Sequence, residues 1–96
     1  MDEVLLTAAV DLSGRAYCVW KADLPTEPLG TFNAAPAEEF WRAVAANGAF
    51  NLHVVCHHGR NAHLVEGIFK AAARALRQAI EPDPRSPGVP STKGVL

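Results

Sequence analysis

The stretch 51-NLHVVCHHGRNAHLVEGIFK-70 decides how this chain is expected to fold. Its first part, Asn51–Cys56, alternates and is rich in valine and leucine, which predicts a β-strand. Gly59 and Asn61 interrupt that strand, and Asn61 is a residue type that caps helix N-termini. Apolar residues then recur at helical spacing to Ile80, so a long helix is expected to follow. The stretch is therefore a strand–turn–helix unit.

All four histidines of the chain lie in this unit: His53, His57, His58 and His63. Glu66 follows His63 after about 300° of helix rotation, so the two side chains share one stripe. A strand that delivers His53 beside a helix that delivers His63 and Glu66 forms half of a candidate metal site. The same pattern also fits a packed strand histidine, a surface pair before a glycine and the solvated stripe of an amphipathic helix.

Length, charge and cysteine usage limit the classes of function. The 96 residues make at most one small domain, which buries roughly two thirds of its surface on folding. A formal net charge of −1 gives no electrostatic reason to expect nucleic acid or an anionic membrane. No basic-plus-apolar run opens the sequence and no apolar run approaches the ~18 residues of a membrane-spanning helix, so neither a leader nor a membrane span is expected. Cys18 and Cys56 lie in apolar strand contexts typical of buried free thiols, so a cytoplasmic location is expected.

Two β-prone runs precede the unit, Val4–Leu12 and Ala16–Ala22, and Ser13-Gly14 between them predicts a hairpin. Residues 23–35 read as a loop. Pro36 suits the first turn of a helix over Pro36–Ala46, and Asn47-Gly48 is a stop signal. The apolar seam of this helix is expected from Phe40 and Val44, widened by Trp41 and Ala43.

The long second helix has two distinct faces. Its apolar face is expected from Leu64, Val65, Ile68, Phe69, Ala72, Leu76, Ala79 and Ile80. The opposite stripe carries His63, Glu66, Lys70, Arg74 and Arg77. We therefore predict one α+β domain over residues 1–96, a two-layer sandwich in which a mixed sheet is backed by two helices on one face.

Pro82 and Pro84 end the second helix, and residues 82–96 form an irregular C-terminal tail. Ser91, Thr92, Lys93 and Gly94 offer hydroxyls, an ammonium and a flexible backbone, which together suit a phosphate. The tail is not a P-loop, because the spaced glycine before the Lys-Thr pair is missing. A short Ser/Thr/Lys tail is also typical of a plain chain terminus.

These segments resemble the C-terminal half of the imidazoleglycerol-phosphate dehydratase family of histidine biosynthesis. The matching segments are MDEVL (1–5), VDLSGR (10–15), NLHVV (51–55), GRNAHLVEGIFKAAARALR (59–77), DPR (83–85) and PSTKGVL (90–96). The resemblance implies two similar repeats of the ribosomal protein S5 domain 2 type, of which this chain supplies the second. The motifs of the first repeat are absent from it.

The resemblance also implies a metal centre of two manganese ions, bound by histidines and glutamates from both repeats. At the matching positions His53 and His63 would coordinate through imidazole nitrogen, and Glu66 through its carboxylate. Ligand type alone would equally allow zinc, nickel or iron, so manganese comes from the resemblance. His57 and His58 fall where the family has residues that do not coordinate metal.

Substrate contacts are carried over in the same way. Arg15, Ser91 and Lys93 match phosphate-binding positions, and Lys70 is expected to reach the substrate. Asp2 matches an acidic residue near the glycerol hydroxyls of the substrate. The resemblance thus makes Asp2 and Glu66 the candidate catalytic residues.

One departure from the family pattern concerns the helix. The family has two adjacent histidines, two further residues and then the glutamate, whereas this chain has Ala62 in place of the first histidine. Adjacent helical residues point about 100° apart and can therefore serve different metals. One of the two ions is expected to lack a ligand.

The function implied is the dehydration of imidazole glycerol phosphate to imidazole acetol phosphate, a hydro-lyase reaction. We expect the isolated chain to be incomplete, because half of the ligands and the proton-transfer glutamate belong to the missing repeat. It would act in a homo-oligomer or in association with a first-repeat half. The alternative is a non-catalytic, self-associating half-domain that binds metal or phosphate.

Overall fold

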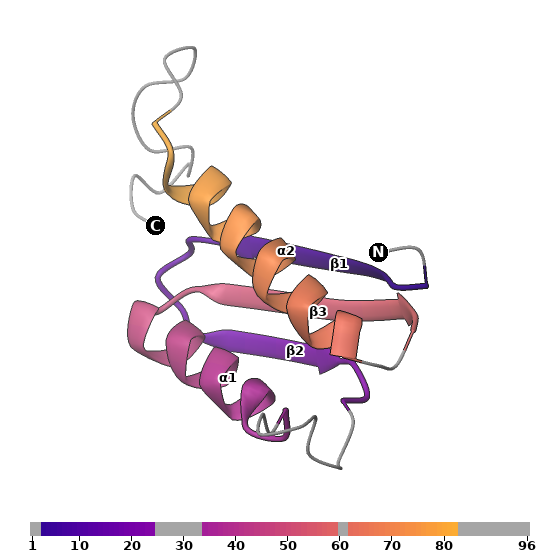
Figure 1. The fold of residues 1–96 in the computed structure, drawn as a ribbon. Helices are drawn as coiled ribbons and strands as arrows, with labels where there is room; N and C mark the ends of the chain where they lie inside the picture. The colour runs from indigo at the N-terminus through magenta and orange to yellow at the C-terminus, as the bar shows by residue number, and fades with distance from the viewer. Residues whose placement is uncertain (1–2, 25–33, 60–61, 83–96) are drawn as a thin grey trace.

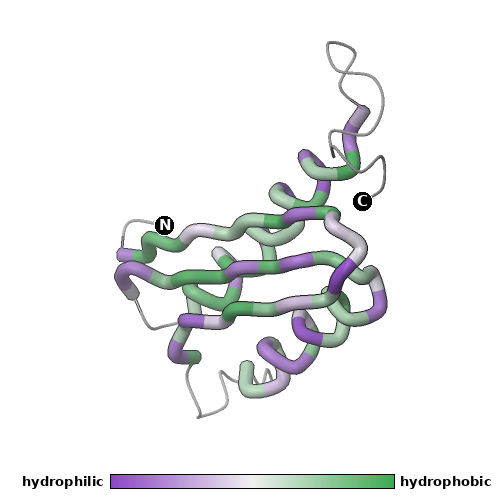
Figure 2. The backbone as a smooth tube through the Cα atoms, turned by 180° about the vertical axis from the view of Figure 1, so that it is seen from behind, coloured by the Kyte–Doolittle hydropathy of each residue, from purple (hydrophilic) through white to green (hydrophobic). Residues whose placement is uncertain are grey.

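The fold is described by a computed structural model, in which residues 3–24, 34–59 and 62–82 can be described. In chain order the elements are β1 (Leu5–Asp11), β2 (Tyr17–Lys21), α1 (Ala37–Gly48), β3 (Asn51–His58) and α2 (Ala62–Ile80). Among these residues, both helices lie on one face of a mixed three-stranded sheet, and no described element covers the other face, called the open face below (Figures 1 and 2). This confirms the predicted α+β two-layer fold.

The predicted hairpin is wrong, because β3 lies between β1 and β2. The strand order is β1-β3-β2, with β3 antiparallel to β1 and parallel to β2. The connection through Gly14, which takes a φ of 80°, passes the start of β3 instead of closing a tight turn. There Asn51 Nδ2 donates to Ser13 Oγ at 3.1 Å, and the Tyr17 amide donates to the Phe50 carbonyl at 3.3 Å.

The central position of β3 follows from its composition. Leu52 and Val54 are fully buried beneath the helices, whereas His53 between them is exposed on the open face. Because side chains alternate along a strand, each neighbour of a core residue on β3 lies on the open face. The strand–turn–helix unit is thus the element on which both other strands assemble.

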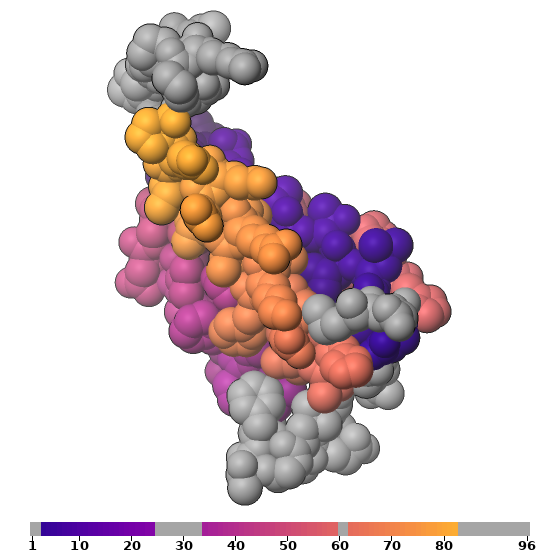
Figure 3. Space-filling model, turned by 45° about the horizontal axis from the view of Figure 1, so that its top comes forward, coloured from indigo at the N-terminus to yellow at the C-terminus, as the bar shows by residue number. Residues whose placement is uncertain are grey.

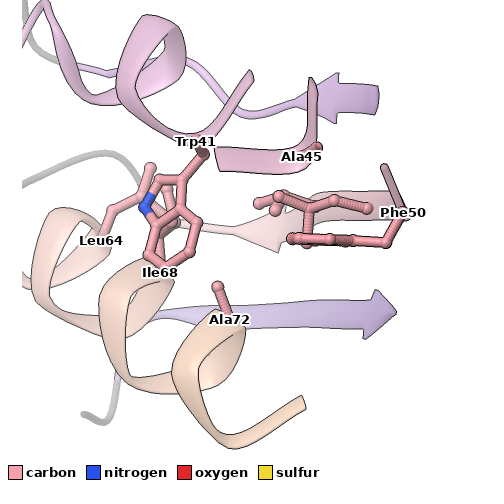
Figure 4. Packing of buried hydrophobic residues seen from close by; sticks show 8 residues of the cluster. Trp41, Ala45, Phe50, Leu64, Ile68 and Ala72 are labelled. Atoms are coloured by element: carbon pink, nitrogen blue, oxygen red, sulfur yellow. The ribbon is translucent and has the colours of Figure 1, made fainter. Parts of the chain in front are cut away.

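The core fills the space between the sheet and the two helices (Figure 4). Helix α2 packs mainly against β1, and α1 packs along β2. The buried cluster consists of Trp41, Ala45, Phe50, Leu52, Val54, Leu64, Ile68 and Ala72.

The apolar seam predicted for α1 is displaced by one residue. The buried positions are Ala37, Trp41 and Ala45, whereas the side chain of Phe40 is 51% exposed. Positions four apart share a face, and the row through Trp41 lies about 100° from the row through Phe40. Alanines on both sides of Trp41 allow the helix to approach the sheet closely.

Two residues of the predicted apolar face of α2 are also exposed, Phe69 at 38% and Ile80 at 63%. Helix α1 ends as predicted near Asn47-Gly48, and Ala49 takes the left-handed conformation with φ 54°. Gly48 is needed at that end, because a Cβ there would lie 2.5 Å from the Phe50 ring.

Some predictions lie outside the described residues: most of the loop over residues 23–35, Asn61 as the helix cap, and the tail beyond residue 82. Among the described residues, no helix has the length and apolarity that would allow it to cross a membrane.

Candidate functional site

His53 lies in the middle of the open sheet face. It is paired with Ala9 of β1 and Val19 of β2, and its ring centroid is 6.3 Å from that of Tyr17. Its side chain is exposed and faces away from both helices. The imidazole is thus accessible to a group that approaches the open face.

His63 and Glu66 lie on the outer surface of α2, on the helix side of the sheet. His63 Nδ1 pairs with the Glu3 carboxylate, and Glu66 Oε1 lies 2.7 Å from Lys70 Nζ. All four side chains remain substantially exposed. The hydrogen bond and charge of Lys70 lower the pKa of the Glu66 carboxyl, so Glu66 is anionic at neutral pH.

The strand histidine and the helix pair lie on opposite sides of the sheet. Among the described residues, no group of three or more histidine, cysteine or acidic side chains is arranged to hold a metal ion. His53, His63 and Glu66 therefore do not share a cation within this part of one chain. Their assignment as ligands stays a prediction, and it requires that ligands from different chains meet.

The two histidines that end β3 are both tied to β1 and the residues before it. A 2.9 Å hydrogen bond joins His57 Nε2 to Thr7 Oγ1. His58 Nδ1 donates to the Glu3 carbonyl at 2.8 Å. These contacts fix the end of β3 against the edge strand, next to the register shift between Leu5 and Leu6.

Glu3 is the residue that the sequence did not single out. Its carbonyl accepts from His58 and its carboxylate pairs with His63, so it links the end of β3 to the first turn of α2. The only signal in the sequence was its place in the acidic pair before β1, which is equally typical of a charged strand end.

The candidate substrate residues are not brought together within the described part. Arg15 lies exposed beyond the carboxyl end of β1. Lys70 lines a groove of about 330 Å³ at the opposite end of β1, beside Val4, Leu5 and Arg74. Asp2, Ser91 and Lys93 lie outside the described residues.

A second cleft, of about 570 Å³, opens at the carboxyl ends of β2 and β3. It is lined by polar and ionisable side chains of both signs, among them Lys21, Asp23, Glu38 and His57. The mixed charge of this lining selects no single class of ligand.

Several relatives that match this chain in sequence, and solved structures that match its fold, are dehydratases of one kind. The family model for imidazoleglycerol-phosphate dehydratase matches residues 1–76. The chain belongs to the imidazoleglycerol-phosphate dehydratase family.

Individual relatives show how much of the enzyme is covered. The dehydratase of Symbiobacterium thermophilum is 55% identical over 99% of this chain and 46% of its own length. That of Paracoccus denitrificans is 52% identical over 100% of this chain and 50% of its own length. The chain thus spans about half the length of the curated relatives that it matches.

Two solved structures share the fold. The Staphylococcus aureus dehydratase has a TM-score of 0.81 and 43% identity, over 86% of this chain and 49% of its own. The Pyrococcus furiosus enzyme, solved in complex with (S)-C348, has a TM-score of 0.78 and 36% identity, over 100% of this chain and 53% of its own.

Proposed function

We propose that this chain is the C-terminal half of a dehydratase that converts imidazole glycerol phosphate to imidazole acetol phosphate in histidine biosynthesis. The observation that carries the proposal is the family match over residues 1–76, which contains β3 with His53 and the part of α2 that carries His63 and Glu66. We propose a cytoplasmic location for this reaction, in keeping with its small, ionic substrate.

Manganese is the proposed metal, and the donors present fit it in kind. Two imidazoles and one carboxylate are ordinary ligands for a divalent transition metal. They do not complete a site within one chain, since only His63 and Glu66 share a stripe. When bound, such an ion would act as a Lewis acid that stabilises charge developing on the substrate.

Each candidate site residue has a proposed role in binding the metal or the substrate. Glu66, already anionic, would supply a charged oxygen, and His63 would exchange its contact with Glu3 for the metal. Arg15, Lys70, Ser91 and Lys93 would hold the substrate phosphate and so fix the position of the reacting carbons. Asp2 would contact the glycerol hydroxyls.

Because His53 and the His63–Glu66 pair face opposite ways, the proposed site must form between chains. A first-repeat half, or further copies of this chain, would present the missing ligands to each face. The isolated chain should therefore have no dehydratase turnover, and activity should return only with the other half.

The test is an assay of the purified chain with Mn²⁺ and imidazole glycerol phosphate, with and without the N-terminal half of the Paracoccus denitrificans relative. We expect turnover only in the mixture, and its loss in Glu66→Gln. The matched control is Gln78→Ala, at an exposed position near the other end of α2. Ordinary turnover by the isolated chain would refute the proposal that it needs the other half. A mixture that is inactive although both halves are folded and bound to each other would refute the proposed reaction.

A second candidate is a non-catalytic half-domain that binds metal or phosphate. The observation that favours a non-catalytic chain is Ala62, since the resemblance implies a metal-binding histidine at that position. Calorimetric titration with Mn²⁺ distinguishes the two candidates, since a binding module should take up the ion alone and lose it in His63→Ala. Equal Mn²⁺ binding by the wild-type chain and His63→Ala would show that α2 does not contribute to the metal site.

A further inference from the structure

The connection between β1 and β2, residues 12–16, crosses the start of the central strand and carries Arg15. Strand β1 ends at Asp11 and β2 begins at Tyr17, and both of these residues pair with Asn51, the first residue of β3 (Figure 1). Neighbouring strands are about 4.8 Å apart, so the two ends of this loop are separated by roughly 10 Å. The chain from Asp11 to Tyr17 can extend to roughly 20 Å. The two ends therefore do not by themselves fix the middle of the loop.

The middle of the loop is held by the side chain of Asn51. Its Nδ2 donates to Ser13 Oγ at 3.1 Å, in a half-buried hydrogen bond. The Ser13 amide in turn donates to the Asp11 carbonyl at 3.0 Å. Gly14 follows with a φ of 80°, and glycine is the residue with the greatest backbone freedom. The Asn51–Ser13 bond thus fixes the loop directly before its most flexible position and two residues before Arg15.

Arg15 depends on this support more than the other described phosphate candidate does. Lys70 lies on α2, a long helix that packs along β1 (Figure 3). Arg15 has an exposed side chain, and its backbone is placed by the loop alone. A guanidinium binds phosphate through paired hydrogen bonds of defined geometry, so a displaced backbone weakens the contact.

A loop that is ordered before the ligand arrives binds more tightly than a mobile one. Ordering backbone and side chains costs conformational entropy, and a loop ordered on folding does not incur this cost again on binding. Asn51 also lies two residues before His53 on β3. The strand that carries the candidate metal-binding imidazole therefore also sets the position of the loop that carries Arg15.

We propose that Asn51 is a positioning residue for the phosphate end of the substrate. Through Ser13 it holds the loop over residues 12–16 so that the Arg15 guanidinium is presented to the phosphate. Asn51 acts through the loop and contacts no substrate atom itself. The inference rests on the proposed function for one point, the role of Arg15 as a phosphate-binding residue.

The first test uses NMR spectroscopy of the full 96-residue chain with inorganic phosphate as the probe. In Asn51→Ala, the backbone order parameters of Gly14 and Arg15 should fall from about 0.85 toward 0.6. Phosphate affinity, followed at the Gly14 amide, should weaken roughly threefold to tenfold, and Arg15→Ala should weaken it at least as much. The matched control is Asn47→Ala, which removes a 2.8 Å bond from Asn47 Nδ2 to the Ala43 carbonyl on α1 and should change neither quantity.

The second test measures turnover in the mixture with the N-terminal half of the Paracoccus denitrificans relative. Asn51→Ala should raise KM for imidazole glycerol phosphate roughly threefold to tenfold and leave kcat within about twofold, because the loss is one of binding. Ser13→Ala should have the same effect, and Ser13→Thr, which restores the hydroxyl, should restore most of the affinity. The double variant Asn51→Ala/Ser13→Ala should be no weaker than either single variant, since both remove one bond.

Unchanged order parameters in Asn51→Ala overturn the inference, and so does a variant that loses stability while its phosphate affinity and KM match those of Asn47→Ala. A wild-type chain that shows no phosphate response, alone or in the mixture, also overturns it. If Asn51→Ala does not fold, Ser13→Ala removes the same bond from the loop side and decides in its place. An inactive wild-type mixture refutes the proposed reaction, and the phosphate titration of the chain alone then decides the role of Asn51.

Discussion

The two outer faces of this small domain differ in kind. The helix face presents stacked aromatic rings, alanines and ion pairs that close within one helix. The open sheet face presents His53, His57, Thr7 and Lys21 across three strands. Apolar groups gain free energy by being covered, whereas accessible imidazoles can bind or coordinate. The accessible imidazole of His53 thus lies on the sheet face, whereas the helix face carries rings that pack on each other. The sheet face is not purely polar, since Tyr17 beside His53 is 62% exposed.

Both faces rest on the same buried core, so truncating a core side chain should have the largest effect on stability. Ile68 is 1% exposed, so Ile68→Ala should lower the free energy of unfolding by about 2–5 kcal/mol. The matched control is Ile80→Ala on the same helix, at 63% exposure, which should change it by less than about 0.5 kcal/mol. Urea unfolding measures both, and equal losses would mean that α2 is not seated as described.

A double-mutant cycle tests whether the two stacked rings of the helix face, Phe40 and Phe69, stabilise each other. Changing Phe40 and Phe69 to alanine singly and together should give a coupling energy of about 0.5–1.5 kcal/mol, because the stacked rings stabilise each other beyond their buried area. The measurement is thermal unfolding of the wild-type chain and the three variants at one low protein concentration. Additive losses would show that the rings do not touch in solution.

On the sheet face, mutation of Thr7 tests how much its hydrogen bond with His57 contributes to stability. Thr7→Val removes the hydroxyl at nearly constant volume and should destabilise the domain by about 0.5–1.5 kcal/mol, the net contribution of a typical hydrogen bond. Thr7→Ser, which keeps the hydroxyl, is the control. If chemical denaturation gives both variants the wild-type free energy of unfolding, this hydrogen bond does not contribute to stability.

The smallest expected effect is electrostatic and lies at the margin of α2. Lys70→Met should return the pKa of Glu66 toward its ordinary value, while Arg74→Met should leave it unchanged. Since Lys70 depresses that pKa in the folded state, its contribution to stability is present above the unfolded pKa and is lost as the pH falls through the folded one. An NMR titration of the Glu66 carboxyl carbon checks this, and an unchanged pKa would mean that the ion pair is not populated.

The elements were predictable because their signals are local. The alternation of Asn51–Cys56, the helical spacing after Asn61 and the stop at Asn47-Gly48 each depend on residues close in sequence. The hairpin was mispredicted because strand pairing depends on residues that are distant in sequence. A tight turn at Gly14 would have paired β1 with β2, but β3, with its buried Leu52 and Val54, lies between them.

The exposed aromatics and the candidate site show a second limit. Phe40 and Phe69 read as core residues because hydrophobicity alone does not say which of two adjacent helical rows meets the sheet. The spacing of His63 and Glu66 correctly predicted a shared helical stripe, since that too is local. No spacing rule could place His53 relative to them, because a strand residue's face depends on which side the helices cover.

The strand order has a consequence for how this polypeptide can be made. Within the described residues, β1 and β2 both pair with β3, so neither has this neighbour until β3, which ends at His58, has left the ribosome. This part of the sheet therefore forms only by inserting a later segment between two earlier ones. Such non-local closure slows folding and leaves strand edges available for mispairing.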